Sequence, residues 1–408
     1  MSLRNFEKDL RATLSELERT GTAKGTERVV TRVMRAEGTK GPRFCLEGYG
    51  DKEFIRMNSN SYLGMGLCRD VLKAEEDGAR RYGVGPGAVR FISGTYEPHV
   101  TLEKKLAAFH GREDCMITSA AYVCVMGVIA TLTTPETVIV SDELNHNCII
   151  NAMKLARPKD KKIYPHLDMN SLEKQIKESE GTCDGIIVVT DGVFSMRGDL
   201  APLDKICDIV RKYNDCFPKD IVLVVDDSHG VGALGESGRG TEEYAGAKGV
   251  DILVATLGKA FGVNGGYVVS SKTVIQFLRE KNPFYIYTNP ITPSEATASL
   301  KALEILQGSE GQTLLARLRA LTRRFEQGLL DLGFETIPSE HPVVPLMVRD
   351  TARTTALVKY LRDHGVLATG LNYPVVPQGD QLIRFQVCAD HTEHDIDYVL
   401  GVLKQFTL

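Results

Sequence analysis

The chain lacks an excess of charge of either sign and any long apolar run. Its 408 residues include 49 lysines and arginines against 53 aspartates and glutamates, for a net charge of −4. This balance points away from nucleic acid and from anionic membranes as partners. No apolar stretch approaches the length of a membrane-spanning helix. The opening "MSLRNFEKDLRATLSELERTG" has acidic residues throughout and no apolar core, so we expect no targeting peptide and a cytoplasmic location.

Paired cysteine motifs are also missing. The nine cysteines are scattered along the chain, odd in number and without a C-x-x-C pair. We therefore expect reduced thiols, as in cytosolic proteins, and neither a disulfide framework nor a zinc site. His391 and His394 stand three residues apart without a third ligand, which favours a surface pair over a metal site.

What the sequence does contain is an alternation of strands and helices between residues 49 and 290. Val- and Ile-rich runs, separated by helical stretches, predict an α/β fold with a mostly parallel sheet that helices cover on both faces. The strands are expected at residues 137–140, 185–189, 221–225 and 252–255.

The segments on either side of this alternation predict two further units. At the N-terminus, an amphipathic helix is expected to place Phe6, Leu10, Leu14 and Leu17 on one face. Towards the C-terminus, a long helical region broken near "GSEG" precedes a strand, a helix, a strand and a helix. We predict an N-terminal helix and arm over residues 1–48, a large domain over 49–293 and a small α/β domain over 294–408.

Chemically useful side chains follow each of the four predicted strands. In open α/β sheets, ligands bind beyond the carboxyl ends of the strands, so the residues found there are candidates for one site. In chain order they are Asp142 and His146, Asp191 and Ser195, then Asp226, Asp227 and His229, and finally Thr256 and Lys259.

Lys259 indicates the chemistry of this site. In "ATLGKAFG", small neighbours leave room for a flat carbonyl cofactor to reach the amine, and pyridoxal phosphate (PLP) is the common cofactor that forms a Schiff base with lysine. The ring nitrogen of PLP must stay protonated, which requires a buried carboxylate such as Asp226. His229 could hydrogen-bond the phenolic oxygen or the substrate, and His146 could lie flat on the ring.

A place for the cofactor phosphate is found in "SAAYVCVMGVIATL", residues 119–132. Small residues precede an apolar helical stretch there, and a helix start offers N–H groups to a phosphate. The spaced glycines of "GVGPGAVRF", residues 83–91, follow a helix rather than a strand, which makes a dinucleotide site a poor explanation. Each feature alone has a simpler explanation, such as a solvated lysine, a capped turn or a loop histidine. Their concentration at four strand ends favours a PLP site.

Several motifs resemble those of the α-oxoamine synthases, fold-type I PLP enzymes that join an amino acid to an acyl-CoA with loss of carbon dioxide. They are "NSNSYLGMG", "VRFISGTYEPHVTLEKKLAAFHG", "SDELNHNCII", "TDGVFSMRGDLAPL", "VVDDSHGVGALGESGRGTEEY" and "ATLGKAFGVNGGYVV". The segments "DDSHGVG", "TDGVFSM" and "GVLATGLNYPVVPQGDQLIRFQ" favour the glycine C-acetyltransferase branch (2-amino-3-ketobutyrate CoA ligases) over the 8-amino-7-oxononanoate synthases. The expected reaction is the condensation of glycine, or another small amino acid, with an acyl-CoA.

The resemblance implies a role for each matching residue. Lys259 would bind PLP covalently and remove the substrate proton, Asp226 would pair with the pyridinium nitrogen, and His229 would bond the phenolic oxygen. His146 would stack on the ring. The phosphate would be held by Ala121, Tyr122 and Thr256, and by Thr288 from the second subunit of a homodimer. The substrate or cofactor would contact Ser195, and the amino-acid carboxylate would bind Asn60 and Arg384.

Four residues depart from the family pattern, namely Val125, Arg197, Pro290 and Asn372. An apolar Val125 would favour a longer acyl chain if its helix lines the acyl channel, so the acyl group stays open beyond acetyl. Two other functions also stay open. One is a different fold-type I reaction, that of an aminotransferase or a decarboxylase, and the other is a scaffold that keeps the fold without the reaction.

Overall fold

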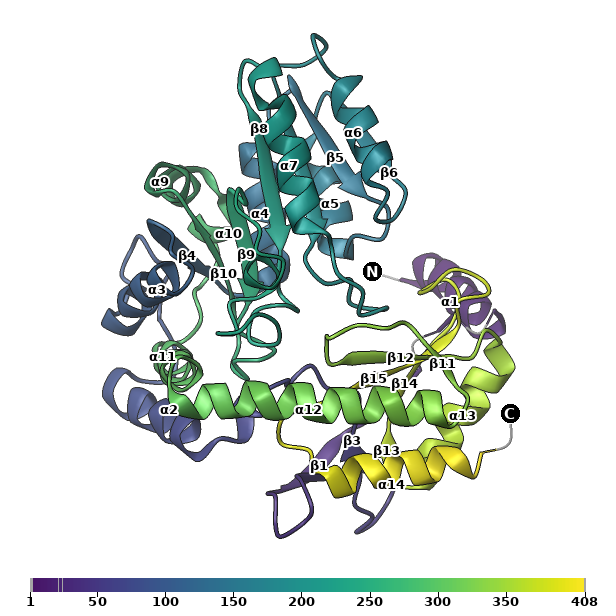
Figure 1. Ribbon diagram of the computed structural model, residues 1–408. Coiled ribbons are helices and arrows are strands. Elements are labelled where there is room, and N and C mark those ends of the chain that lie inside the picture. The colour runs from purple at the N-terminus through teal and green to yellow at the C-terminus, as the bar shows by residue number, and fades with distance from the viewer. Residues whose placement is uncertain (1–2, 21, 24, 407–408) are drawn as a thin grey trace.

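A seven-stranded sheet lies at the centre of the larger part of the molecule, as the computed structural model of residues 3–20, 22–23 and 25–406 shows (Figure 1). The strand order is β4-β10-β9-β8-β7-β5-β6. The strands from β9 to β6 run parallel, and β10 is antiparallel to both β9 and β4. The strands are β4 (Asp114–Thr118), β5 (Thr137–Asp142), β6 (Asp160–Tyr164), β7 (Gly185–Asp191), β8 (Ile221–Asp226), β9 (Ile252–Thr256) and β10 (Gly266–Ser270).

Helices cover this sheet on both faces, and the strand residues divide between them. In β5, Val138 and Val140 belong to one buried cluster together with Ile206, whereas Ile139 belongs to a second cluster together with Ile149. This alternation follows from the period of two in a strand. Together with the parallel pairing of the strands from β9 to β6, the helices on both faces confirm the predicted mostly parallel sheet. The helices of this part are α2 (Arg69–Tyr82), α3 (Glu97–Phe109), α4 (Ala121–Leu132), α5 (Asn147–Ala156), α6 (Met169–Lys177), α7 (Leu203–Tyr213), α8 (Thr241–Tyr244), α9 (Lys272–Lys281) and α10 (Pro283–Ile286).

The long helical region is also confirmed. It is divided at Gly308 into α11 (Pro293–Gln307), which packs on α2, and α12 (Ser309–Asp331), which crosses to the C-terminal part (Figure 1). There a four-stranded antiparallel sheet has the order β11-β12-β15-β14. The elements of this part are β11 (Glu335–Thr336), β12 (Val343–Met347), α13 (Thr351–Asp363), β13 (Val366–Leu367), β14 (Thr369–Leu371), β15 (Leu382–Gln386) and α14 (Glu393–Lys404).

The N-terminal segment contains more structure than its sequence predicts. The expected helix is present as α1 (Arg4–Arg19), with its apolar side chains exposed in the single chain. The polar connection after it, however, contains the antiparallel hairpin of β1 (Val30–Met34) and β2 (Arg43–Leu46). β3 (Ile55–Arg56) pairs with β13, and Arg43 forms a buried ion pair with Asp395 at 2.5 Å. This segment therefore packs on the C-terminal part.

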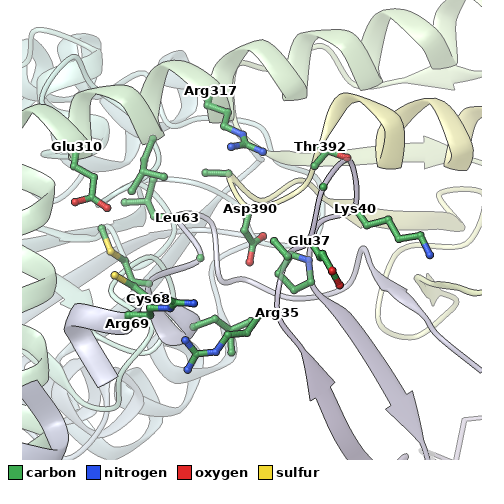
Figure 2. Close-up of a pocket in the computed structure, with 18 residues that line it drawn as sticks. Arg35, Glu37, Lys40, Leu63, Cys68, Arg69, Glu310, Arg317, Asp390 and Thr392 are labelled. Atoms are coloured by element: carbon green, nitrogen blue, oxygen red, sulfur yellow. The ribbon is translucent and has the colours of Figure 1, made fainter. Parts of the chain in front are cut away.

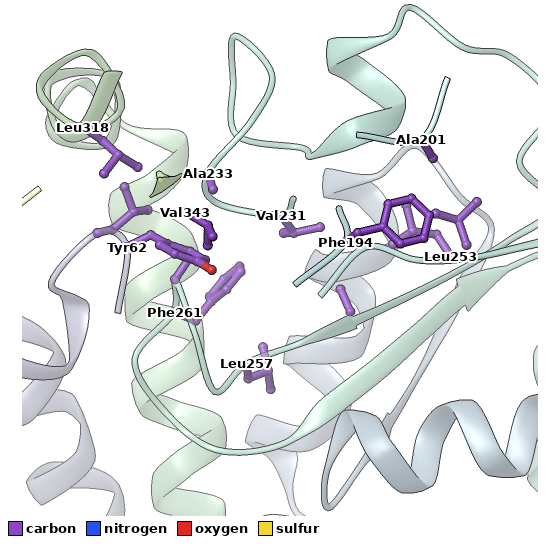
Figure 3. Packing of buried hydrophobic residues seen from close by; sticks show 14 of the residues in the cluster. Tyr62, Phe194, Ala201, Val231, Ala233, Leu253, Leu257, Phe261, Leu318 and Val343 are labelled. Atoms are coloured by element: carbon purple, nitrogen blue, oxygen red, sulfur yellow. The ribbon is translucent and has the colours of Figure 1, made fainter. Parts of the chain in front are cut away.

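The larger core cluster reaches the loops that follow the central strands. Figure 3 shows Val231 and Ala233 from the loop after β8, together with Leu257 and Phe261 from the loop after β9. Tyr62 and side chains of α12 and β12 belong to the same cluster. Loops packed this closely hold their polar side chains in fixed positions.

Candidate active site

A cavity of about 280 Å³ opens where β5, β7, β8 and β9 end. These four strands are neighbours in the sheet, so their carboxyl ends lie side by side. Nine of the residues expected at this site line the cavity, and three more complete it. The expected ones are Ala121, Tyr122, His146, Asp191, Ser195, Asp226, His229, Thr256 and Lys259, and the others are Ala120, Cys148 and Ser228.

Lys259 is not the solvated surface lysine that its loop position would suggest by itself. Burial lowers the pKa of its ammonium to about 8, although Asp226 and Asp191 act in the opposite direction. A sizeable fraction of the amine is therefore neutral near pH 7.5, which is the form that attacks a carbonyl. Lys259 thus has the properties of a nucleophile.

Two carboxylates from neighbouring strands lie close to this amine. Asp191 and Asp226 are register partners at the ends of β7 and β8. Burial and the charge of Asp226 raise the pKa of Asp191 well above its usual value, which favours the neutral form of Asp191. The Asp226 carboxylate accepts a hydrogen bond from Ser228 N (3.1 Å) and a weak one from the Cys148 thiol (3.6 Å). These two donors hold the Asp226 carboxylate in place.

The two predicted histidines differ in their surroundings. His229 is buried, and burial with the nearby charge of Lys259 lowers its pKa well below the usual value, so the ring is neutral. A 2.7 Å hydrogen bond between its Nδ1 and the Tyr62 hydroxyl orients it, and His341 Nε2 lies 3.0 Å from its carbonyl oxygen. His146 is exposed at the rim and is fixed through its backbone N–H, which donates to Asp191 (2.8 Å).

The start of α4 forms the opposite end of the cavity. Its N-cap, Ala120, offers no side-chain cap to the first N–H groups of the helix. Backbone crowding explains the small residues here, because a Cβ on Gly266 would lie 2.3 Å from Ala121 N. Thr256 donates to Gly265 O and accepts from Gly258 N, each at 3.0 Å. A helix start without a side-chain cap leaves N–H groups free to bind an anion.

The remaining predicted residues lie outside this cavity. Arg384 on β15 donates to Asn60 Oδ1 at 3.2 Å, while its buried Nε has no partner among the described residues. Its charge lowers the pKa of both Lys259 and His229, so the guanidinium faces the same site. Thr288 follows α10 and does not line the cavity of its own chain.

Comparisons with known proteins agree with this geometry. The sequence model of aminotransferase class I and II matches residues 52–403. An 8-amino-7-oxononanoate synthase of Thermosipho melanesiensis is 38% identical over 91% of this chain and 92% of its own length. A 2-amino-3-ketobutyrate coenzyme A ligase of Escherichia coli K12 is also 38% identical, over 91% of this chain and 89% of its own.

Solved structures of the same type superpose over nearly the whole chain. The serine palmitoyltransferase of Sphingomonas wittichii has a TM-score of 0.88 at 28% identity and covers 99% of this chain and 97% of its own. A lysine-to-alanine variant of the S. paucimobilis enzyme, solved with a bound aldimine of PLP and myriocin, has a TM-score of 0.87 at 25% identity and covers 99% and 98%. The chain belongs to the α-oxoamine synthases.

This α-oxoamine synthase is a PLP-dependent enzyme of the fold-type I group. Its residues fit the cofactor: the uncapped start of α4 suits a phosphate, Lys259 suits an aldehyde, and Asp226 suits a pyridinium. Ser228 Oγ is a further buried atom without a partner among the described residues. When bound, PLP withdraws electrons from the α-carbon of an amino acid. The protein supplies the charges and hydrogen bonds that hold it in place.

Sequence reasoning missed three side chains that shape this site, namely Cys148, Tyr62 and His341. Asp191 was expected at its strand end, but its raised pKa depends on the charge of Asp226, which the sequence alone does not place beside it. Cys148 follows His146 by two residues, and burial with the charge of Asp226 raises its thiol pKa. Tyr62 and His341 reach His229 from distant segments. Only the position of Tyr62 in "NSNSYLG" gave a signal.

Two sequence expectations are wrong. Val125 is buried in the second core cluster with Cys124 and Val128, so its side chain faces no channel. His391 is buried rather than on the surface. Its Nδ1 accepts the Cys388 N–H (3.1 Å), and it also bonds the backbone of Arg56. With these contacts made, its cluster with Cys388 and Asp390 has no free imidazole nitrogen for a metal.

A larger cavity lies away from the cofactor cavity. It measures about 470 Å³ and is lined by the β1–β2 hairpin, the start of α2 and α12 (Figure 2). Asp390 points into it between Arg317 and Glu37. None of the predicted site residues lines it. None of the helices that the structure describes is long and apolar enough to cross a membrane.

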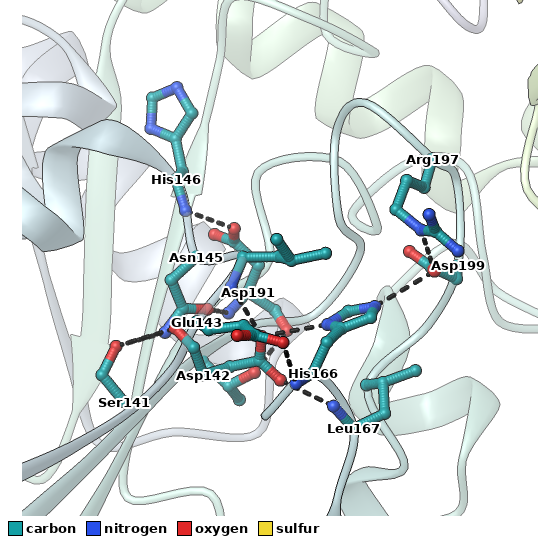
Figure 4. Close-up of polar contacts among 12 residues, drawn as sticks. Ser141, Asp142, Glu143, Asn145, His146, His166, Leu167, Asp191, Arg197 and Asp199 are labelled. Atoms are coloured by element: carbon teal, nitrogen blue, oxygen red, sulfur yellow. Dashed lines mark hydrogen bonds and ion pairs between the residues drawn. The ribbon is translucent and has the colours of Figure 1, made fainter. Parts of the chain in front are cut away.

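A charged network fixes the loop that carries Ser195. His166 lies between two carboxylates, with Nδ1 3.0 Å from Asp142 and Nε2 3.1 Å from Asp199, and Arg197 donates to Asp199 at 2.9 Å (Figure 4). Burial lowers the pKa of His166, but the hydrogen bonds to Asp142 and Asp199 together outweigh it and raise the pKa to about 9. His166 is therefore an imidazolium at neutral pH.

Stability is expected to depend on this charge. Because the folded pKa of about 9 exceeds the unfolded value of ~6.5, the stabilisation is complete below pH 6.5 and is lost as the pH rises through 9. We expect His166→Gln to lower the unfolding free energy by up to about 3 kcal/mol at pH 6 and by much less at pH 10. Thermal unfolding of both proteins across this range measures the difference. A difference that does not change with pH would contradict the charge assignment.

Proposed function

We propose that this α-oxoamine synthase condenses glycine, or another small amino acid, with the acyl group of a short acyl-CoA and releases carbon dioxide and free CoA. The observation that carries the proposal is the position of Lys259, a half-buried amine beside Asp226 and His229, with the unpartnered Arg384 Nε nearby. A guanidinium with a free N–H binds a carboxylate well. The amine of Lys259 is placed to take a proton from the substrate.

The preference for a small amino acid follows from the wall of the cavity. Its lining consists of alanines, polar groups and the edge of Tyr122, without a large aliphatic side chain. A long apolar side chain would gain no apolar partner there and would displace water from Asp191 and Ser195. Glycine has no side chain that would need an apolar partner in the cavity.

The comparisons support a second candidate for the acyl substrate. Relatives named 8-amino-7-oxononanoate synthase and 2-amino-3-ketobutyrate coenzyme A ligase share the same 38% identity with this chain. A long acyl thioester is therefore the alternative to a short one, and an aminotransferase reaction is the less supported alternative.

Turnover with a panel of thioesters tests the proposal. With glycine, we expect release of free thiol from acetyl- and propionyl-CoA, with kcat/KM at least about tenfold above that for hexanoyl- or pimeloyl-CoA, which must fit two or more further methylenes. A preference for pimeloyl-CoA would show that the enzyme uses a long acyl thioester instead. Conversion of amino acids without release of thiol would indicate an aminotransferase, and no turnover with bound PLP would indicate a scaffold.

We further propose that the enzyme is a cytoplasmic homodimer with shared active sites. Val84, Phe91, Ile92 and Tyr287 are between 67% and 84% exposed in the single chain. The Arg90 guanidinium lies over the Tyr285 ring at 5.7 Å and connects the two segments that carry these residues. Exposed apolar side chains of this number mark an interface. Thr288 follows Tyr287, so a partner on this surface would receive it at its own site.

A further inference from the structure

A second, smaller cavity adjoins the cofactor cavity at Ser195. Ser195 lines both of them, so the two spaces lie on either side of one side chain. This cavity measures about 70 Å³. Apart from Ser195, its wall is made of Leu144, Phe194, Met196, Val375, Val376, Pro377 and Leu382, with Arg197 and Asp380.

The apolar wall comes from both parts of the molecule. Phe194 and Met196 belong to the loop after β7, and Val376 and Leu382 belong to the C-terminal part around β15. Met196 packs on the small buried cluster that contains Val376 and Leu382. The cavity therefore exists only while these two segments stay together.

One ion pair joins the two segments. Arg197 Nη1 lies 3.1 Å from Asp380 Oδ2, and both side chains line the cavity while remaining 26% and 30% exposed. They stand between the cavity and solvent. Arg197 is also held by Asp199, and Asp380 by Arg349 at 3.3 Å. With His166 and Asp142 beyond Asp199, charges of alternating sign run from one part to the other.

The chemistry of this space indicates its occupant. Its wall is aliphatic and aromatic, and its one cation is already engaged by two carboxylates, which leaves no partner for a charged tail. Its volume is about half of the ~150 Å³ that accepts benzene in an engineered cavity, which corresponds to two or three carbon atoms of a chain. An uncharged short alkyl chain fits it.

We propose that this cavity takes the tail of the acyl group and that the Arg197–Asp380 ion pair limits its length. The inference rests on the proposed function, because it assigns a place to the acyl group of that reaction. Arg197 and Asp380 are specificity-determining residues in this assignment. Neither residue lines the cofactor cavity.

Binding of non-reacting S-alkyl-CoA thioethers to the PLP-loaded enzyme tests this inference without turnover. Isothermal titration would compare the ethyl, butyl, hexyl and octyl thioethers. In the wild type, affinity is expected to rise about fourfold for each methylene that becomes buried up to butyl, and to fall below the ethyl value for hexyl and octyl, which exceed the cavity. Asp380→Asn and Arg197→Met remove the ion pair with little change in size. In both, we expect hexyl and octyl thioethers to bind at least about fivefold more tightly relative to butyl.

Controls separate the ion pair from general loosening. Arg324→Ala removes an exposed ion pair with Asp397 elsewhere in the C-terminal part and should leave the chain-length profile unchanged. The double variant of Arg197 and Asp380 should gain no more than either single one, because both lose the same contact. An unchanged profile in Asp380→Asn and Arg197→Met, a steady rise through octyl in the wild type, or no thioether binding would overturn the inference. Failure of the proposed function would appear instead as absence of thiol release with glycine, whatever the thioethers do.

Discussion

Replacing Lys259 with alanine is expected to abolish turnover and the visible absorption that the lysine-bound cofactor gives the enzyme. In the proposed function, the variant loses both the amine that attaches PLP and the base that takes the substrate proton. A positioned acid–base group alone contributes 10²–10⁴-fold, so we expect kcat to fall by about 10³-fold or more. Absorbance spectra and thiol release with glycine measure the two losses on one sample.

Two controls show that the loss is specific to Lys259. Lys174, exposed in a surface pair with Glu178, has no place in the site, and Lys174→Ala should keep the wild-type rate and spectrum. In the proposed homodimer, Lys259→Ala chains mixed with Thr288→Ala chains should regain part of the activity. One site of each hybrid then receives an intact Lys259 from one chain and an intact Thr288 from the other. Full activity or an unchanged spectrum in Lys259→Ala would contradict the assignment.

The candidate site was largely predictable because it depends on local order along the chain. A buried strand followed at once by a polar side chain places that side chain at one edge of a parallel sheet. His146, Asp226 and Lys259 were found in this way, and the structure brings them to one cavity. Arg384 and Asn60 come from distant segments, and no rule of spacing joins them. Only the family resemblance indicated that they belong together.

The elements that depend on contacts between distant segments of the chain were not predicted from the sequence. The hairpin of β1 and β2 has an outer strand that is mostly exposed, so it shows no alternation of apolar residues. β3 and β13 are each two residues long, and each forms a strand only by pairing with the other. His391 looked like a surface residue because its neighbours are polar, whereas its burial depends on the backbone of Arg56.

The expectation that Val125 could line an acyl channel failed for a different reason. Cys124 and Val125 lie one helical turn before Val128 and Ile129 on α4, and all four are buried in one cluster. The helical period alone would have placed Val125 in the core. The apolar space beside Ser195 was instead hidden from the sequence, since its wall combines residues 194–197 with residues 375–382.

The second large effect is expected to differ between two neighbouring carboxylates, of which the sequence analysis gave a role only to Asp226. Asp191 and Asp226 end adjacent strands, and both line the cofactor cavity. Burial and the charge of Asp226 raise the pKa of Asp191 well above its usual value, which favours its neutral form. Asn has nearly the same shape as that neutral form and can still accept the His146 N–H. We therefore expect Asp191→Asn to change kcat/KM less than about fivefold.

Asp226→Asn removes the carboxylate that is proposed to pair with the ring nitrogen of PLP. A carboxylate is required to keep the ring nitrogen of bound PLP protonated, and an amide cannot do so. Removing one partner of a buried charged pair costs about 3–5 kcal/mol, so we expect a loss of about 10²- to 10³-fold in kcat. In Asp226→Asn the pKa of Asp191 should also fall, because the neighbouring negative charge is gone. Steady-state rates of the two variants, with PLP content measured on each, test the assignment. Equal losses in both, or a larger loss in Asp191→Asn, would show that Asp191 carries the charge instead.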